Sequence, residues 1–248
     1  MEITRLNADS SWLIQLGSFR FVLDPWLVGP QIDGVAWFSK QWHAKPCTSF
    51  SEIGNIDGIV ISHPFTDHCH KETLLNFPTS TPVWAAPSAA KTIRSWNYFH
   101  TVYSIGFQKP VKNGSVQMAF YPSQGLIDPV HDALLFTNLD SGEIIFYAPH
   151  GFKPSPKLSL PTNVTLLITT TIQYNLPFWL GGTVNLGQKA AKVLVEKVKP
   201  KHLVYTHNEH KHAEGLVSKL ANPDWNEKLD LSNVNTLFPE LSKPLTLN

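Results

Sequence analysis

Apolar and polar positions alternate along this chain in short blocks, a pattern typical of strands interleaved with helices. Trp12 to Leu16 and Phe19 to Leu23 are two apolar runs separated by Gly17-Ser18, which predicts a β-hairpin. The second run stops at Asp24-Pro25 because proline lacks a backbone donor. The same reading predicts further strands at 57–62, 83–86, 116–121, 131–138, 143–147, 164–171 and 202–206, and helices at 71–77, 88–96, 186–198 and 211–220.

Two stretches interrupt this pattern. Periodicity disappears from Val28 to Ser49, where Trp37, Phe38, Trp42 and His43 accumulate. A structureless stretch of this length is usually functional or disordered, and its aromatic content argues against disorder. We therefore expect a lid or wall over a site. A second irregular stretch covers 173–183.

The order of elements predicts the fold class. Strands and helices come first, a meander of strands follows, and the chain returns to strand, helix, strand, helix. Two facing sheets with helices on both outer faces satisfy this order. We expect one α/β domain over residues 1–248, a four-layer αββα sandwich.

Composition narrows the class of protein. Of the 248 residues 42% are hydrophobic and 16% charged, enough apolar material for a sizeable core. The net charge of +1 gives no field that would recruit nucleic acid or a membrane surface, and the lysines around 189–201 are interpreted as one solvated helix face. Two cysteines make no disulfide framework, and no stretch resembles a signal peptide or a membrane span. The expectation is a cytoplasmic protein with a small-molecule substrate; its oligomeric state is left open.

The densest polar segment follows the predicted strand 57–62 and reads His63-Pro64-Phe65-Thr66-Asp67-His68-Cys69-His70. Side chains at the carboxyl end of a strand converge where open α/β sheets bind ligands. Imidazole and carboxylate are ligand types that zinc, iron and manganese accept. The alternative is a surface turn with solvated histidines.

This segment resembles the metallo-β-lactamase superfamily, whose signature is His-x-His-x-Asp-His after a strand. The chain has His63-x-Phe65-x-Asp67-His68 instead. The opening hairpin of that family resembles LGSFRFVLDPWL, with Asp24 at the position of an aspartate that lies behind the metal ligands. Its Gly-Asp strand resembles IIFYAPHG, with His150 in place of the bridging aspartate. Its closing helix and strand resemble GGTVNLGQKAAKVLVEKVKPKHLVYTH, which ends at His207. The resemblance spans roughly residues 10 to 210 and is closest to the branch of lactonases and phosphodiesterase-like hydrolases.

The departures from the family pattern concern its first metal site. Phe65 cannot ligate a metal, and the third ligand of that site falls at Ser123-Gln124, where glutamine is a poor ligand for a transition metal. His63 then stands alone. The resemblance therefore implies that the first site does not fill.

The second site of the family is implied to consist of Asp67, His68, His150 and His207. Three imidazoles and a carboxylate suit one divalent ion, zinc first, with iron or manganese as alternatives. An open coordination position would hold a water whose pKa the metal lowers toward ~7. If all four side chains bind tetrahedrally, the site is structural instead.

Other residues have weaker claims. His70 could be a substitute ligand, although it fits the start of a helix, and His131 could replace the missing third ligand, although it lies at a predicted strand start. His43 could contact substrate or lie at the surface, and His210 and His212 are expected to face solvent. Cys69 could be a thiolate ligand or a small buried hydrophobe. Tyr174, Phe178 and Trp179 could line a pocket or simply pack.

The resemblance implies a metal-dependent hydrolase that attacks an ester, lactone or phosphoester. Asp67 and His63 would be its catalytic residues, with His63 orienting substrate or water. Substrate would enter between the 28–49 and 173–183 loops. The alternative is a catalytically degenerate binding or regulatory protein on the same scaffold, favoured by Phe65 and Gln124. An iron-dependent redox enzyme is a third hypothesis.

Overall fold

Two seven-stranded sheets form the centre of the protein. The computed structural model describes residues 1–107, 109–124, 129–225 and 234–247. The first sheet has the order β20 (Pro244–Thr246), β1 (Glu2–Arg5), β2 (Trp12–Leu16), β3 (Phe19–Leu23), β6 (Gly58–Ile61), β7 (Val83–Ala85) and β8 (Val102–Ser104). The second has the order β19 (Asn235–Leu237), β16 (His202–Tyr205), β13 (Leu166–Thr169), β12 (Ile144–Ala148), β11 (Ala133–Asn138), β10 (Val116–Tyr121) and β9 (Val111–Asn113).

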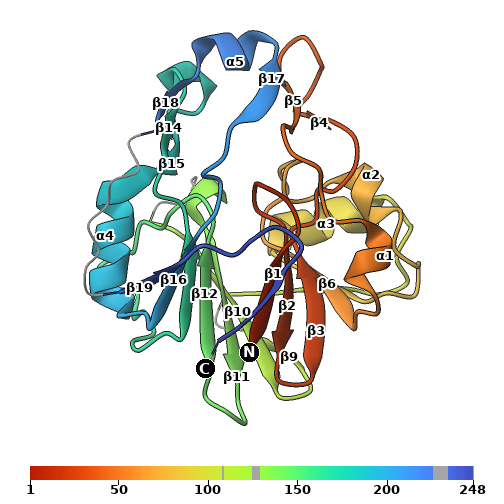
Figure 1. The fold of residues 1–248 in the computed structure, drawn as a ribbon, viewed down its shortest axis with the longest axis vertical. Coiled ribbons are helices and arrows are strands. Elements are labelled where there is room, and N and C mark those ends of the chain that lie inside the picture. Colours follow the sequence, from red (N-terminus) through yellow and green to blue (C-terminus); the bar gives the residue numbers. More distant parts are fainter. Residues whose placement is uncertain (108, 125–128, 226–233, 248) are drawn as a thin grey trace.

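Helices cover the outer face of each sheet. The first sheet carries α1 (Phe50–Ile53), α2 (Lys71–Leu74) and α3 (Pro87–Ser95), and the second carries α4 (Gly187–Val198) (Figure 1). This arrangement confirms the predicted αββα sandwich. None of the helices in the described ranges is long and apolar enough to cross a membrane.

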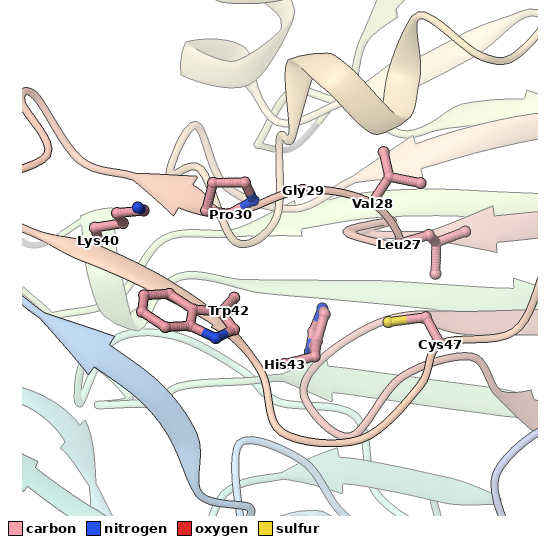
Figure 2. A pocket seen from close by; sticks show the side chains of 8 residues that line it. All are labelled: Leu27, Val28, Gly29, Pro30, Lys40, Trp42, His43 and Cys47. Carbon is pink, nitrogen blue, oxygen red and sulfur yellow. The ribbon is translucent and has the colours of Figure 1, made fainter.

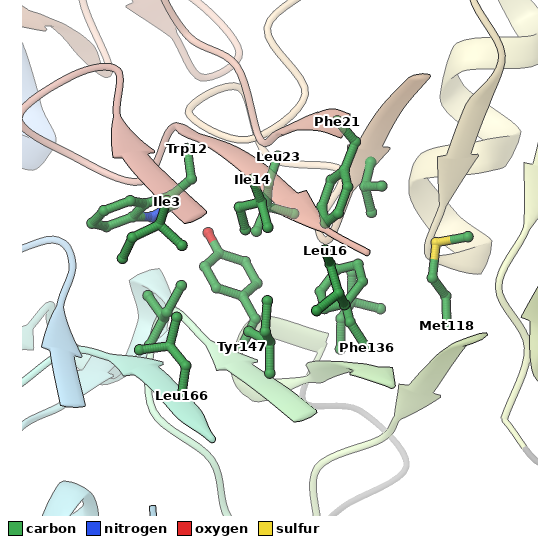
Figure 3. Packing of buried hydrophobic residues seen from close by; sticks show 14 of the residues in the cluster. Ile3, Trp12, Ile14, Leu16, Phe21, Leu23, Met118, Phe136, Tyr147 and Leu166 are labelled. Atoms are coloured by element: carbon green, nitrogen blue, oxygen red, sulfur yellow. The ribbon is translucent and has the colours of Figure 1, made fainter. Parts of the chain in front are cut away.

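The core between the sheets follows from alternation along the strands. In β2, Trp12, Ile14 and Leu16 face the second sheet, whereas Leu13 faces the helices. Figure 3 shows these side chains meeting Phe136 and Tyr147 of the second sheet. Both strands of the predicted hairpin have the predicted bounds, and every position in them except Gln15 and Arg20 is buried.

Two small sheets stand above this sandwich in Figure 1. One contains β15 (Thr183–Leu186), β14 (Gln173–Asn175) and β18 (Asn222–Asp224); the other contains β17 (Lys211–Glu214), β5 (Lys40–His43) and β4 (Gln31–Ile32). Short 3₁₀ helices cover Pro129–His131 and Phe178–Leu180. The stretches 28–49 and 173–183 are therefore partly regular, which their lack of periodicity did not indicate.

The predicted helix over 211–220 is wrong in its first half. Lys211–Glu214 is a strand paired with β5, and only α5 (Leu216–Leu220) is helical. Gly215 separates them at φ 98, a backbone conformation that side chains disfavour, and a Cβ there would lie 2.7 Å from the carbonyl oxygen of Phe38. Pairing with a distant loop overrides the local helical preference.

The strands that precede the candidate site residues end at one edge of the sandwich. β3 and β6 of the first sheet and β12 and β16 of the second all finish there (Figure 1). Residues far apart in the sequence, from Asp24 to His207, therefore meet between the two sheets.

Candidate metal centre

Four side chains predicted as ligands lie together at this edge. Asp67, His68, His150 and His207 each offer one ligand atom, and these atoms lie within 4.8 Å of one another. Asp67 and His68 come from the turn after β6, His150 from the turn after β12, and His207 from the residues after β16. All four are buried. We call this group the metal cluster.

Each histidine of the metal cluster is fixed by a hydrogen bond from its Nδ1. His68 donates to Asp24 at 2.7 Å, His150 to the side-chain oxygen of Asn185 at 2.7 Å, and His207 to Asp9 at 2.6 Å. Since carboxylate and amide oxygens only accept, each Nδ1 carries the proton. The Nε2 atoms are left to face the interior of the cluster, the orientation seen in carboxylate–histidine–metal triads.

Of the three residues that accept a hydrogen bond from these histidines, Asp24 accepts the most hydrogen bonds in the described structure. Besides His68 it accepts hydrogen bonds from the Tyr147 hydroxyl at 2.8 Å, the Ser62 backbone N–H at 2.7 Å and the Ser62 hydroxyl. It is fully buried and has a φ of 47, a strained conformation for a residue other than glycine. Backbone strain held in place by many bonds is typical of a functional site.

Asp9 holds a different histidine of the metal cluster, His207, through its Oδ1. Its second oxygen accepts a hydrogen bond from Nζ of Lys211 at 2.8 Å. Burial raises the pKa of Asp9, but the charges of His207 and Lys211 outweigh burial and hold this pKa well below its ordinary value. Asp9 is therefore an ionised carboxylate with only 1% of its surface exposed.

The donor set of the metal cluster fits a divalent ion. Nε2 of His207 is buried without a hydrogen-bond partner in the described part of the chain, an orphan that a metal would satisfy. Burial and the neighbouring histidines hold the pKa of His150 well below its ordinary value, so its imidazole is neutral, as a ligand must be. Three imidazoles beside the Asp67 carboxylate match the preferences of zinc, iron and manganese.

His63 lies beside the metal cluster but outside it. Its ring centroid is 4.9 Å from that of His68 and 5.2 Å from that of His150. Burial, followed by the charge of His68, holds the pKa of His63 well below its ordinary value, so this imidazole is neutral. Phe65 stacks against it at 6.0 Å between ring centroids.

A second group of close donors, Asp24, His63 and His68, is less suited to a metal. The Asp24 oxygens are already occupied by hydrogen-bond donors, as described above. Gln124, at the position of the missing third ligand, is exposed. That the first site of the family pattern does not fill stays a prediction.

The remaining candidates have other roles in the described structure. His70 caps α2, with its Nδ1 accepting from the Thr73 backbone N–H at 3.3 Å. His131 belongs to neither group of donors. Burial raises the pKa of the Cys69 thiol, which makes it a poor thiolate ligand. His210 and His212 are exposed, as expected.

The two irregular loops contribute unequally. Phe178 and Trp179 are 95% and 68% exposed, so neither is packed into the core. In the 28–49 loop, the ring of His43 lies 3.9 Å from that of Trp26, and His43 Nε2 lies 3.0 Å from the Trp26 carbonyl oxygen. His43 therefore packs on Trp26.

A pocket of about 450 Å³ opens within the 28–49 loop. Leu27, Val28, Gly29 and Pro30 form one side and Trp42, His43 and Cys47 the other, with Lys40 at the end next to Pro30 (Figure 2). None of the four residues of the metal cluster lines it. One lining residue, His43, is paired across two strands with Lys211. Lys211 in turn bonds Asp9, the partner of His207 in the metal cluster.

Sequence reasoning missed three residues of this site: Asp9, Asn185 and Lys211. Asp9 lies in the polar run Asn7-Ala8-Asp9-Ser10-Ser11, directly before the first predicted strand. A buried turn beside the site could have been suspected from that concentration of Asx and serine residues. Nothing local distinguishes Lys211 from the other lysines.

Comparison with known proteins agrees with the fold. A family model described as "Beta-lactamase superfamily domain" matches residues 2–207. Among solved structures, an isothiocyanate hydrolase from Delia radicum gut bacteria is similar at TM-score 0.70 and 15% identity, covering 100% of this chain and 99% of that one. A possible metal-dependent hydrolase from Veillonella parvula is similar at TM-score 0.68, with the same identity and coverage.

A curated relative belongs to another reaction class. The cytidine monophosphate-N-acetylneuraminic acid hydroxylase of Xenopus laevis is 33% identical over 72 residues. That match covers 28% of this chain and only 11% of the hydroxylase.

Proposed function

Because the chain belongs to the beta-lactamase superfamily, we propose that it is a hydrolase working with one divalent ion, zinc before iron or manganese, held by Asp67, His68, His150 and His207. The bond it cleaves is an ester, a lactone or a phosphoester of a small molecule. All three suit a nucleophile generated from water by a metal.

One observation carries this proposal: the Nδ1 of every histidine in the metal cluster is tied to a different acceptor. Histidines that merely fill a core are not expected to present all their Nε2 atoms to one point beside a carboxylate. A divalent ion bound there supplies a Lewis acid and lowers the pKa of water toward ~7.

The chain's own residues have distinct tasks in this proposal. Asp67 contributes the negative charge of the cluster, and its carboxylate would accept a proton from water. His63, neutral and adjacent to His68 and His150, orients the substrate or the water by hydrogen bonding. Phe65 shields this end of the site, where its ring stacks on His63.

The pocket in the 28–49 loop accommodates the apolar end of the substrate in this proposal. Its walls are aliphatic and aromatic except for Lys40, His43 and Cys47. Nζ of Lys40 lies 5.3 Å from the ring centroid of Trp42, so a positive charge lies at this aromatic wall. A substrate with an apolar body fits this chemistry.

The test combines metal analysis with an activity screen. Purified protein is reconstituted with zinc and assayed against p-nitrophenyl esters and bis-p-nitrophenyl phosphate, beside the variant His207→Ala. We expect turnover that requires both zinc and His207. A metal-bound protein that cleaves none of these compounds would favour the binding or regulatory protein instead.

A second candidate is an iron-dependent hydroxylase. The similarity to the Xenopus laevis hydroxylase favours it, although the match covers a small part of that protein. Iron in the purified protein, together with oxygen consumption and no hydrolysis, would favour this candidate over the hydrolase.

A further inference from the structure

Two charged residues lie behind His207, on the side away from the metal cluster. Oδ1 of Asp9 accepts the Nδ1–H of His207 at 2.6 Å, and Oδ2 of Asp9 accepts from Nζ of Lys211 at 2.8 Å. The imidazole of His207, the carboxylate of Asp9 and the ammonium of Lys211 are thus connected by two successive hydrogen bonds. Asp9 is 1% exposed and the Lys211 side chain 19%.

The backbone that carries Asp9 is held in place by its own hydrogen bonds. The side-chain oxygen of Asn7 accepts the backbone N–H groups of Asp9 at 2.9 Å and Ser11 at 3.0 Å. The Asp9 carbonyl oxygen accepts from the Thr206 hydroxyl at 2.8 Å, directly before His207. The turn is therefore tied both to itself and to the segment that it supports.

Lys211 reaches Asp9 from a different element. It lies on β17 opposite His43 of β5, and its ammonium lies 5.4 Å from the ring centroid of Trp26. With Trp26 on one side and Asp9 on the other, the ammonium has little freedom to turn away. It neutralises a carboxylate that would otherwise be buried with an uncompensated charge.

We propose that Asp9 and Lys211 are positioning residues for His207. Asp9 fixes the Nδ1–H tautomer and the ring orientation of His207, and Lys211 acts through Asp9 by holding its second oxygen away from the metal cluster. This inference rests on the proposed metal-dependent function. Its physical basis is that the outer partner of a metal-ligating histidine sets which nitrogen is free to ligate.

The arrangement also links the 28–49 loop to the metal cluster. β5 pairs with β17, Lys211 of β17 bonds Asp9, and Asp9 bonds His207. A displacement of the loop would be transmitted to a ligand through three direct contacts. Lys211 is the contact at which loop and ligand meet.

The experiment measures zinc affinity and the tautomer of His207 separately. Zinc dissociation constants are determined by competition with a chromophoric chelator for the wild type, Asp9→Ala, Lys211→Met and the double variant. Imidazole ¹⁵N NMR of the metal-free proteins reports which nitrogen of His207 is protonated. Glu214→Gln is the matched control. Glu214 lies on β17, as Lys211 does, but its ion pair is an exposed one with Lys40 of β5.

We expect Asp9→Ala to weaken zinc binding by about 10- to 100-fold and to convert His207 from the Nδ1–H form to a mixture of tautomers. Lys211→Met should weaken binding by less, and the double variant should bind zinc no more weakly than Asp9→Ala, because Lys211 acts only through Asp9. Glu214→Gln should match the wild type.

Wild-type zinc affinity in a folded Asp9→Ala protein would overturn the proposal, and additive losses in the double variant would overturn the role given to Lys211. If Asp9→Ala does not fold, the milder variants Asp9→Asn and Lys211→Arg replace Asp9→Ala and Lys211→Met. A smaller loss of zinc affinity is then expected for each. If the wild type binds no zinc, the proposed function fails. The positioning role is then decided by NMR: an unchanged His207 tautomer in the Asp9 variants overturns it.

Discussion

The Nε2 atoms of His68 and His150 lie 2.9 Å apart at the centre of the metal cluster. His150 donates its Nδ1–H to Asn185, so its Nε2 carries a lone pair. The proton between the two rings therefore belongs to His68, which also donates its Nδ1–H to Asp24. Burial lowers the pKa of His68, but Asp67 and Asp24 outweigh burial and raise this pKa to about 9. In the metal-free protein a proton occupies the nitrogen that a metal would need.

The first prediction is that His68 is doubly protonated in the metal-free protein at pH 7.5 and loses its Nε2 proton when zinc binds. Ligand nitrogens must be deprotonated, so metal and proton compete for the same atom. Imidazole ¹⁵N NMR with and without zinc measures this directly. His70 is an internal control in the same spectrum, since burial lowers its pKa and it should be neutral. A neutral His68 in the metal-free protein would refute the prediction.

The second prediction concerns the stability of the metal-free protein. The pKa of His68 in the folded chain, about 9, lies above the ordinary histidine value of 6.5. A raised folded pKa gives stability that is fully present below pH 6.5 and is lost as the pH rises through 9. At about 1.4 kcal/mol per pH unit, the loss amounts to roughly 3 kcal/mol at most.

Urea unfolding between pH 6 and pH 9.5 measures this loss, with His68→Gln as the reference that lacks the titrating group. The difference in free energy of unfolding between the wild type and His68→Gln should shrink across this range. A difference that stays constant with pH would contradict the pKa assigned to His68.

The third prediction concerns Asp24→Asn. An amide has one accepting oxygen in place of two, so donors among Ser62, Tyr147 and His68 would lose their acceptor. We expect zinc affinity to fall by about 10- to 100-fold and the free energy of unfolding by about 1–3 kcal/mol. Chelator competition and urea unfolding measure the two effects. Asp57→Asn is the control, since that carboxylate accepts the Arg20 backbone N–H far from the metal cluster and should leave zinc affinity unchanged.

The fourth prediction concerns the pocket in the 28–49 loop. With p-nitrophenyl esters of increasing acyl length, the KM of the wild type should fall as the chain lengthens, because each buried CH₂ contributes about 0.8 kcal/mol. Trp42→Ala should flatten this trend. Trp179→Ala should preserve it, since that tryptophan is exposed on the other loop and does not line the pocket. A trend unaffected by Trp42→Ala would mean that the apolar end of the substrate binds elsewhere.

Sequence reasoning succeeded where short-range pattern and strand ends determine the structure. The hairpin 12–23 was predictable because Trp12, Ile14 and Leu16 alternate with residues that face the helices. The grouping of Asp67, His68, His150 and His207 was predictable because each follows a strand that ends at the same edge. Their role as metal ligands stays a prediction.

The rest depends on contacts between distant segments. Lys211–Glu214 reads locally as the start of a helix, but its strand conformation comes from pairing with Lys40–His43. Asp9 is buried through hydrogen bonds to Asn7, His207 and Lys211, not through an apolar pattern. Asn185 follows an irregular segment, and only the fold brings it to His150.

The most direct test of this account is the metal content of the purified protein, measured by inductively coupled plasma mass spectrometry after reconstitution with zinc and exhaustive dialysis. One tightly bound ion per chain is expected in the wild type and none in His207→Ala, because the metal cluster provides one complete set of donors. The second group of donors, around His63, shares His68 with the metal cluster, and its Asp24 oxygens already accept hydrogen bonds. Two ions per chain in the wild type, or none after reconstitution, would contradict the claim that the metal cluster holds a single ion.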